Sequence, residues 1–194
     1  MSDDIRKKAG KSLVEYGMKL VETGLVQGTW GNLSVRVSDT SMLVTPSGLD
    51  YAGLTPGDMV EVDVTSLEYR GILPPTSEKG VHAGIYRMRS DVGAVIHTHS
   101  KYCSVFAAAR KSVPIEEPEL QKVFGRTVRL AAYALPGTEQ LWENTLQALS
   151  ENSGCVMAGH GMLCVGRTLQ EAFENCCRLE DYCGRYIESR YMKR

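Results

Sequence analysis

The chain has 194 residues, of which 43% are hydrophobic and 23% charged, with a formal net charge of −1 and an isoelectric point near 6.4. This length most simply forms one domain, residues 1–194, and the composition is typical of a soluble globular protein. The balanced charge argues against a nucleic-acid partner, although local basic patches could still attract small phosphates.

The cysteine pattern and the hydropathy of the sequence indicate the cellular compartment in which the protein is found. No apolar stretch approaches the length of a membrane-spanning helix, and the N-terminal residues lack the pattern of a secretory signal. The six cysteines form no C-x-x-C pair, and several occupy apolar positions where a free thiol packs as a small hydrophobic group. We therefore expect a reduced, cytoplasmic protein with no membrane partner, and a disulfide framework is the less favoured alternative.

The first part of the chain predicts a helix followed by short strands. Ser2 precedes two aspartates, which suits a helix start, and Gly24 is a suitable stop. Alternating residues then predict strands over 33–37 and 59–64, with a shorter strand over 42–45 between them.

Two loops beside these strands carry groups that could hold a ligand. Gly31 and Asn32 combine close backbone approach with a side-chain amide. Ser47 and Gly48 offer a hydroxyl group and a backbone N–H, which make a modest cradle for an anion. Taken alone, each stretch is better explained as an ordinary turn.

A second helix is predicted after a strand that ends at residues 73–75. Thr76, Ser77 and Glu78 begin this helix, with Ser77 as its N-cap. Three apolar residues at helical spacing should form its buried stripe: Val81, Ile85 and Met88.

The same helix region carries two side chains that could take part in catalysis or ligand binding, Glu78 and His82. Glu78 lies in the first turn, where the simplest explanation for a carboxylate is that it complements the helix dipole. His82 has no partner at ligand spacing, so we interpret it as a packed or hydrogen-bonding histidine.

Residues 94–100 are the most informative stretch, because an apolar strand pattern ends there in two histidines. Residues i and i+2 of a strand face the same side, so His97 and His99 can direct both imidazoles to one point. A second apolar run leads to His160, between two glycines. Three histidines from two strand ends match a catalytic zinc site, in which three protein ligands leave one position open. The alternative is three buried, hydrogen-bonded histidines without a metal.

The remaining chain predicts helices around further strands. A helix is expected over 102–109, prolines argue against a clean helix over 111–126, and a strand is expected over 128–133. The next helix should turn five residues inward: Leu141, Trp142, Thr145, Leu146 and Leu149. Thr168 and Glu171 predict a capping box at the start of the last helix. This mixture favours a largely antiparallel sheet covered by helices.

Five blocks of this sequence together resemble the class II aldolase/adducin-head family, which includes the fuculose-phosphate aldolases. They match the family's order and approximate spacing over essentially the whole chain. The blocks are Gly28-Thr29-Trp30-Gly31-Asn32-Leu33-Ser34, Thr45-Pro46-Ser47-Gly48, Ser77-Glu78, His97-Thr98-His99-Ser100 and Gly159-His160-Gly161.

The resemblance implies an α/β fold of the α+β type, with three α/β/α layers around a mainly antiparallel sheet. It also implies a zinc-dependent aldolase that cleaves a ketose 1-phosphate, such as L-fuculose 1-phosphate, to dihydroxyacetone phosphate and a small aldehyde. Manganese or cobalt could replace zinc. Members of this family are usually homotetramers with active sites between neighbouring chains.

Residue by residue, the resemblance makes His97, His99 and His160 the zinc ligands. Glu78 would be the catalytic acid/base and would also reach the metal when no substrate is bound. The groups implied to hold the sugar phosphate are Gly31, Asn32, Ser47, Gly48, Thr76 and Ser77.

The chain departs from the fuculose-phosphate aldolases on the aldehyde side. Pro118 stands between two glutamates where those enzymes have a tyrosine, Leu135-Pro136 replaces an expected aromatic residue, and Tyr191 lies too near the C-terminus to match a second tyrosine. The substrate therefore stays open. The alternatives are a methylthioribulose-phosphate-type dehydratase, a 3-oxo-tetronate-phosphate decarboxylase, a pentulose-phosphate 4-epimerase, or a non-enzymatic adducin-head-like binding module.

Overall fold

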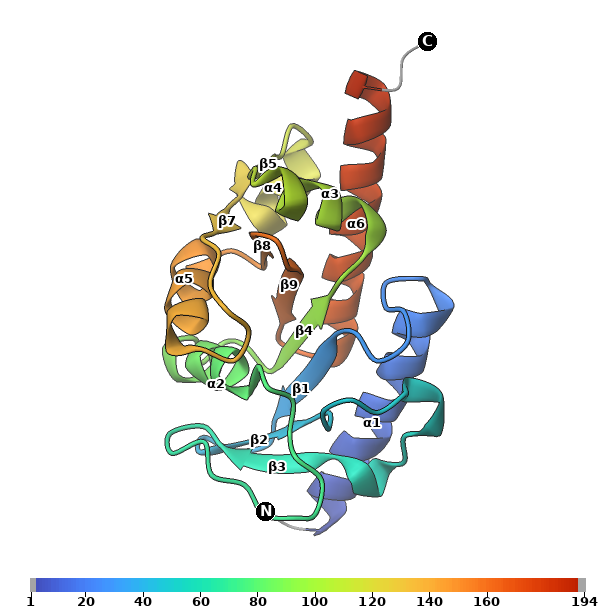
Figure 1. Ribbon diagram of the computed structural model, residues 1–194, viewed down its shortest axis with the longest axis vertical. Coiled ribbons are helices and arrows are strands. Elements are labelled where there is room, and N and C mark those ends of the chain that lie inside the picture. The colour runs from blue at the N-terminus through green and yellow to red at the C-terminus, as the bar shows by residue number, and fades with distance from the viewer. Residues whose placement is uncertain (1–2, 192–194) are drawn as a thin grey trace.

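The computed structural model describes residues 3–191 and arranges them in three layers, with a sheet between two groups of helices (Figure 1). The strands are β1 (Asn32–Arg36), β2 (Ser41–Val44), β3 (Val60–Asp63), β4 (Ala94–Thr98), β5 (Val113–Pro114), β6 (Thr127–Val128), β7 (Leu130–Ala131), β8 (Gly154–Met157) and β9 (Gly161–Gly166). The helices are α1 (Asp3–Glu22), α2 (Lys79–Met88), α3 (Lys101–Ala109), α4 (Pro118–Phe124), α5 (Glu139–Leu149) and α6 (Leu169–Tyr191), with short 3-10 turns η1 (Tyr51–Gly53) and η2 (Pro56–Asp58).

The central sheet has seven strands in the order β3-β2-β1-β4-β9-β8-β7, and β5 and β6 form a separate pair. Neighbouring strands of the central sheet are antiparallel except β7 and β8, which are parallel. The structure thus confirms the predicted mainly antiparallel sheet between helices.

Strand alternation divides the hydrophobic core into two halves. Ile96 of β4 packs in the half covered by α1, α3 and α6, whereas its neighbour Val95 packs in the half covered by α2 and α5. Because alternate residues of a strand face opposite layers, His97 shares the side of Val95. The strand therefore directs this histidine toward α2, the helix that follows Glu78.

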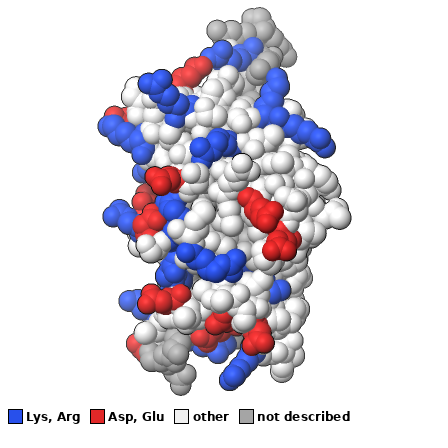
Figure 2. Space-filling model, turned by 90° about the vertical axis from the view of Figure 1, so that its left-hand side faces the viewer, with Lys and Arg blue, Asp and Glu red and all other residues white. Residues whose placement is uncertain are grey.

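The surface and the cysteines agree with an ordinary globular chain. On the face shown in Figure 2, basic and acidic side chains are interspersed. All six cysteines are free thiols, and five of them are buried. None of the helices within residues 3–191 combines the length and the apolarity that crossing a membrane requires.

One strand predicted in the first half was wrong, and one predicted helix cap is not tested. The proposed cap at Ser2 lies outside the described residues. The strand expected before residues 73–75 is absent from the described chain, where single bridges join Val62 to Tyr69 and Pro46 to Pro75. Proline lacks the N–H group that would continue a strand ladder, which explains why a single bridge forms between Pro46 and Pro75.

The start and the buried stripe of α2 also differ from the prediction. The N-cap position is Glu78, one residue later than expected, and Ser77 is exposed. Val81 and Ile85 are buried as predicted, but Met88, the last residue of the helix, is 50% exposed.

In the second half, the prolines do not prevent a helix. Pro118 begins α4 in the first turn, where its missing N–H group needs no partner. The strand predicted over 128–133 is split, because β6 pairs with β5 while β7 joins the central sheet. Trp142 and Leu146 of α5 are only partly buried.

The capping box at the start of α6 is half formed. The hydroxyl oxygen of Thr168 accepts a hydrogen bond from the Glu171 N–H at 3.2 Å. The Glu171 carboxylate accepts one from the Arg167 N–H at 3.0 Å, and so it does not return to Thr168 as the prediction required.

The contact between α2 and α5 gives a direct test of the packing. A Cβ atom at Gly80 would lie 1.9 Å from the indole ring of Trp142. We expect Gly80→Ala to lower the free energy of unfolding by about 1–3 kcal/mol through overpacking, despite the better helix propensity of alanine. Gly53→Ala is the matched control, because no neighbouring atom lies within 4 Å of a Cβ there. Urea unfolding of both variants measures the difference, and equal midpoints would contradict the described packing.

Candidate metal centre

The structure brings the three predicted histidines together. His97 is buried on β4, His99 follows the end of that strand, and His160 lies in the turn between β8 and β9. One ligand-type atom from each histidine lies within 4.8 Å of the others. Gly159 makes the turn possible, because its φ of 64° is readily adopted only by glycine.

The donor set and its geometry fit a metal ion. His97 Nδ1 lies 2.8 Å from the carbonyl oxygen of Met162, an acceptor, so Nδ1 carries the proton and the lone pair lies on Nε2. His97 Nε2 lies 2.9 Å from His99 Nε2. In a tetrahedral zinc site with bonds of roughly 2.0–2.1 Å, neighbouring ligand nitrogens are about 3.3 Å apart. The two rings therefore converge at close to the spacing of adjacent metal ligands.

Glu78 completes this group of side chains from the other side. Its Oε1 lies 2.5 Å from His160 Nε2, and its Oε2 lies 3.6 Å from His97 Nε2. The carboxylate makes no capping hydrogen bond to α2, so the helix-dipole explanation does not describe its contacts. Three imidazoles and one carboxylate oxygen are a typical ligand set for zinc.

The electrostatics of the cluster favour a carboxylate among neutral rings. Burial alone would raise the pKa of Glu78, but the attraction of His97 in its protonated form and the hydrogen bonds of His160 and Asn32 outweigh it and hold this pKa below its ordinary value. Burial lowers the pKa of His97 to about 4 and also lowers the pKa of His99. Both rings are therefore neutral at neutral pH, which is the form that binds metal.

A buried chain of hydrogen bonds extends behind Glu78. Asn32 Nδ2 donates to Glu78 Oε2 at 3.2 Å, and Asn32 Oδ1 lies 2.6 Å from His82 Nε2. On the other side of the ring, His82 Nδ1 lies 2.7 Å from Ser34 Oγ, which lies 2.8 Å from the Tyr86 hydroxyl group. The prediction that His82 is a hydrogen-bonding histidine is confirmed, but its connection to Glu78 was not predicted.

Three loops place the predicted phosphate-binding residues next to one another. The Ser47 N–H donates to the Pro74 carbonyl at 2.9 Å, and the Thr76 N–H donates to the Thr45 carbonyl at 3.1 Å. The Thr45 hydroxyl oxygen in turn accepts from the Leu33 N–H, one residue after Asn32. The loops that carry Gly31-Asn32, Ser47-Gly48 and Thr76-Ser77 are thus joined directly.

A glycine lets the backbone pack closely at one of these loops, and other parts of the loops are exposed. Gly31 has a φ of 99°, and a Cβ atom there would lie 2.7 Å from the His97 carbonyl oxygen, so only glycine fits. Gly48 and Ser77 are exposed, whereas Asn32 and Thr76 are buried. The exposed backbone amides and hydroxyls could bind a phosphate, supported from below by the buried polar groups.

Two exposed aromatic residues beside the histidines were not singled out by the sequence. The Trp30 ring lies 5.8 Å from the His99 ring and is 62% exposed. Tyr133 is 52% exposed, and its ring atoms come within 3.4 Å of the position of a Cβ atom on Gly159, which precedes His160. Strand and turn patterns give no signal for such contacts, because they arise from the pairing of distant segments.

Glu180 of α6 anchors the segment that follows His99. Its carboxylate accepts hydrogen bonds from the Ser100 hydroxyl group at 2.6 Å and from the backbone N–H groups of Tyr102 and Cys103 at 2.6 Å and 2.9 Å. A side chain from another helix thus caps α3, and the negative charge also complements the dipole of that helix.

Removing this cap should be costly. We expect Glu180→Ala to lower the free energy of unfolding by roughly 2–3 kcal/mol, since hydrogen bonds to a charged group contribute most when their partners are partly buried. Glu174→Ala, on the same helix, removes only exposed contacts, an ion pair to Arg178 and a hydrogen bond from Gln170, and should change stability by less than about 0.5 kcal/mol. Chemical unfolding compares the two variants, and a Glu180→Ala protein as stable as the control would refute the role of this cap.

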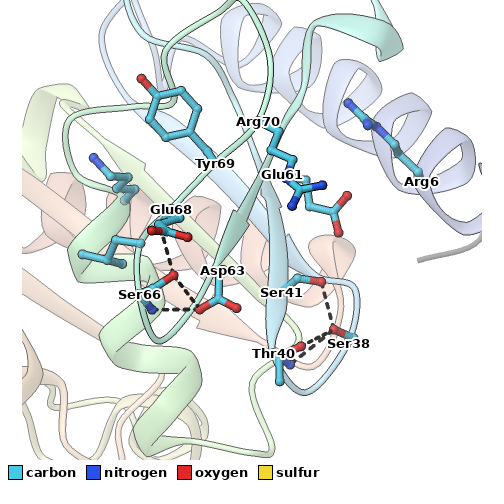
Figure 3. A pocket seen from close by; sticks show the side chains of 12 residues that line it. Arg6, Ser38, Thr40, Ser41, Glu61, Asp63, Ser66, Glu68, Tyr69 and Arg70 are labelled. Atoms are coloured by element: carbon cyan, nitrogen blue, oxygen red, sulfur yellow. Dashed lines mark hydrogen bonds between the residues drawn. The ribbon is translucent and has the colours of Figure 1, made fainter.

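Another cleft lies elsewhere on the surface. It runs beside β3 and the loop that follows, and Figure 3 shows Asp63, Ser66 and Arg70 along it. Asp63 is engaged locally, because it accepts hydrogen bonds from the backbone N–H groups of Thr65 and Ser66. Among the described residues that line this cleft there is no histidine, so it is separate from the candidate metal centre.

The fold and the site define a class of protein: a three-layer α/β/α domain in which strand ends and one loop bring three histidines and a glutamate together. Comparison with known proteins agrees. The family model described as the Class II Aldolase and Adducin N-terminal domain matches residues 11–187. The chain belongs to this family.

Several relatives have names that specify an activity. The chain is 38% identical, over 90% of its length and 78% of the relative, to a 5-methylthioribulose-1-phosphate/5-deoxyribulose-1-phosphate aldolase of Rhodospirillum rubrum. It is 32% identical to the L-fuculose phosphate aldolase of Escherichia coli, over 86% of this chain and 77% of that protein. A solved structure of L-fuculose 1-phosphate aldolase superposes with a TM-score of 0.87 at 33% identity and covers 96% of this chain and 86% of that one.

Proposed function

We propose that this protein is a zinc-dependent aldolase that cleaves a ketose 1-phosphate into dihydroxyacetone phosphate and a short aldehyde. The observation that carries the proposal is the position of Glu78, whose carboxylate oxygens contact His160 at 2.5 Å and Asn32 at 3.2 Å. One carboxylate thus lies between the candidate metal ligands and the loops proposed to hold the phosphate. Family membership supports the same class of reaction.

The roles of the protein side chains follow from this geometry. A divalent cation held by His97, His99 and His160 would polarise the carbonyl group of the substrate and stabilise the negative charge that develops during cleavage. When the C3–C4 bond breaks, the C4 hydroxyl group releases its proton to solvent as the aldehyde forms, and C3 gains a proton that Glu78 has taken up from solvent. Glu78 holds and delivers the proton at C3, a role for a positioned acid/base group.

We place the phosphate group at the three joined loops. Gly31, Asn32, Ser47, Gly48, Thr76 and Ser77 supply hydroxyls, one side-chain amide and those backbone N–H groups that are not already donated to Pro74 and Thr45. No arginine is required by this arrangement, because several neutral donors directed at one anion bind it well. Binding the phosphate fixes the distance between the reacting carbon atoms and Glu78.

The aldehyde end of the substrate would lie near exposed apolar side chains. Tyr133 packs against Gly159, and Leu135, two residues later, is 63% exposed. The Rhodospirillum rubrum relative is named for substrates that carry a methylthio group or no hydroxyl group at C5. We therefore propose that this chain prefers a ketose 1-phosphate whose last carbon atom lacks a hydroxyl group, with L-fuculose 1-phosphate as a further candidate.

A substrate panel tests the proposal. The purified protein is incubated with 5-deoxyribulose 1-phosphate, 5-methylthioribulose 1-phosphate, L-fuculose 1-phosphate and ribulose 1-phosphate, and release of dihydroxyacetone phosphate is measured. The proposal predicts release from the first two at higher kcat/KM than from ribulose 1-phosphate. Loss of water or carbon dioxide from related sugar phosphates, without cleavage, would instead identify a dehydratase or a decarboxylase.

We also propose that the protein is a cytoplasmic homotetramer of single-domain subunits with active sites between neighbouring chains, as is usual in this family. Light scattering of the purified protein tests this directly. A mass near four times 21.4 kDa is expected, and a stable, active monomer would contradict the assembly.

A further inference from the structure

His82 is the one histidine of the four in this chain that lies outside the candidate metal centre. It is fully buried, and both of its ring nitrogens have partners, Asn32 Oδ1 at 2.6 Å and Ser34 Oγ at 2.7 Å. Burial lowers its pKa to about 3, against the opposing charge of Glu78, so the ring is neutral. A neutral imidazole has one N–H donor and one acceptor nitrogen.

The Glu78 carboxylate fixes the direction of every hydrogen bond in the buried network behind it. A carboxylate only accepts, so Asn32 must present its NH2 group to Glu78 and its carbonyl oxygen to His82. That oxygen also only accepts, so His82 Nε2 carries the proton. Nδ1 is then the acceptor and receives the hydroxyl proton of Ser34.

The Tyr86 hydroxyl group ends this series of hydrogen bonds. Because Ser34 has given its single proton to His82, the Tyr86 hydroxyl group must donate to Ser34. The order of donors is thus Tyr86, Ser34, His82, Asn32, and the final acceptor is Glu78. All of these groups are buried, so water does not compete for them.

We infer that His82 is a positioning residue, which as its Nε2–H tautomer holds the Asn32 amide in the orientation that donates to the Glu78 carboxylate. The alternative orientation of Asn32 would direct its carbonyl oxygen at a carboxylate oxygen, and the two would repel each other. His82 therefore acts through Asn32 and does not touch the substrate. This inference rests on the proposed function, because it treats the hydrogen bond from Asn32 to Glu78 as support for catalysis by Glu78.

The first test separates the N–H donor of His82 from its bulk. His82→Leu fills a similar volume without a donor, and kcat for dihydroxyacetone phosphate release should fall roughly 10–100-fold, as is typical when an outer hydrogen-bonding partner of an active-site group is lost. His82→Gln offers an N–H group near the position of Nε2 and should recover most of that loss. Metal content should be unchanged in both. Thr145→Val, which removes another buried hydroxyl group on α5, is the control and should retain the wild-type kcat.

A double-mutant cycle tests whether His82 acts through Asn32. In an Asn32→Ala background, His82→Leu should change kcat by less than about 2-fold, because the group that it orients is gone. A full 10–100-fold loss in that background would mean that His82 acts by another route, and it would overturn the inference. So would a His82→Leu protein with the wild-type kcat.

The tautomer itself can be measured without any enzyme activity. Nitrogen-15 NMR of protein labelled at histidine should show His82 protonated at Nε2 and unprotonated at Nδ1, also in a His99→Ala background where the metal ligand set is broken. A ring protonated at Nδ1, or at both nitrogens, at neutral pH would overturn the inference even if His82→Leu failed to fold. An inactive wild type with the Nε2–H tautomer would contradict the proposed function while leaving the described hydrogen bonds in place.

Discussion

Replacing Glu78 by glutamine should lower kcat for cleavage by about 100- to 10,000-fold, the range that a positioned acid/base group contributes. Glutamine has the same shape and can still contact His160 and Asn32, but it cannot take up and release a proton at C3. The three histidines remain, so the protein should keep its metal. Initial rates of dihydroxyacetone phosphate release measure the effect, together with metal content on the same sample.

The control for this change is Glu68→Gln, a carboxylate in the exposed cleft beside β3. It should leave both kcat and metal content at their wild-type values. If Glu78→Gln cleaved its substrate at the wild-type rate, Glu78 would have only a structural role and another group would have to supply the proton.

Replacing His99 by alanine should lower the affinity for zinc by more than about 100-fold, since loss of an outer-sphere partner alone already costs roughly 10–100-fold. His99 lies just beyond β4 and is only partly buried, so the sheet should persist without it. Calorimetric titration of the metal-free protein with zinc measures the affinity, and the far-ultraviolet circular dichroism spectrum checks the fold.

Cys177→Ala is the matched control for metal binding, because Cys177 is the one partly exposed thiol and a thiolate could also bind zinc. The affinity of this variant should equal that of the wild type. If His99→Ala retained zinc and Cys177→Ala lost it, the metal would lie at the thiol, and the three-histidine site would be wrong.

The layers of the fold were predictable because the spacing of apolar residues in each strand and helix indicates which face is buried. Alternation on β4 places Val95 and His97 on one side, and helical spacing places Val81 and Ile85 on the inner face of α2. Loop residues lack such a period. The segment from Tyr69 to Pro75 was wrongly predicted to include a strand. It pairs through one bridge at Tyr69 and one at Pro75, where proline has no N–H group to extend a ladder.

Within the candidate site, local pattern alone pointed to His97 and His99, which lie two residues apart. Glu78 was different, because its position at a helix start has an ordinary electrostatic explanation, and only the family resemblance suggested catalysis. Its contacts with Asn32 and His160 depend on how β1 pairs with β4 and how α2 packs on the sheet. The hydrogen bonds of Ser34 and Tyr86 depend on the same packing, and no local pattern reveals them.

The site residues therefore differ in how much of their arrangement the sequence could predict. Asn32 and Ser34 alternate on β1 and face the same side, and His82 and Tyr86 are four residues apart on α2, so each pair shares one face of its element. That these two faces meet is a fact of tertiary structure. Once it is known, the carboxylate of Glu78 determines the direction of each hydrogen bond between them.

The most direct test of the account measures metal content and cleavage on one sample before and after chelation. Purified protein should contain one zinc ion per subunit and release dihydroxyacetone phosphate from 5-deoxyribulose 1-phosphate. Removing the zinc with a chelator should abolish release, and adding one equivalent should restore it. Cleavage that continues at the original rate in metal-free protein would contradict the three-histidine centre as the basis of the activity.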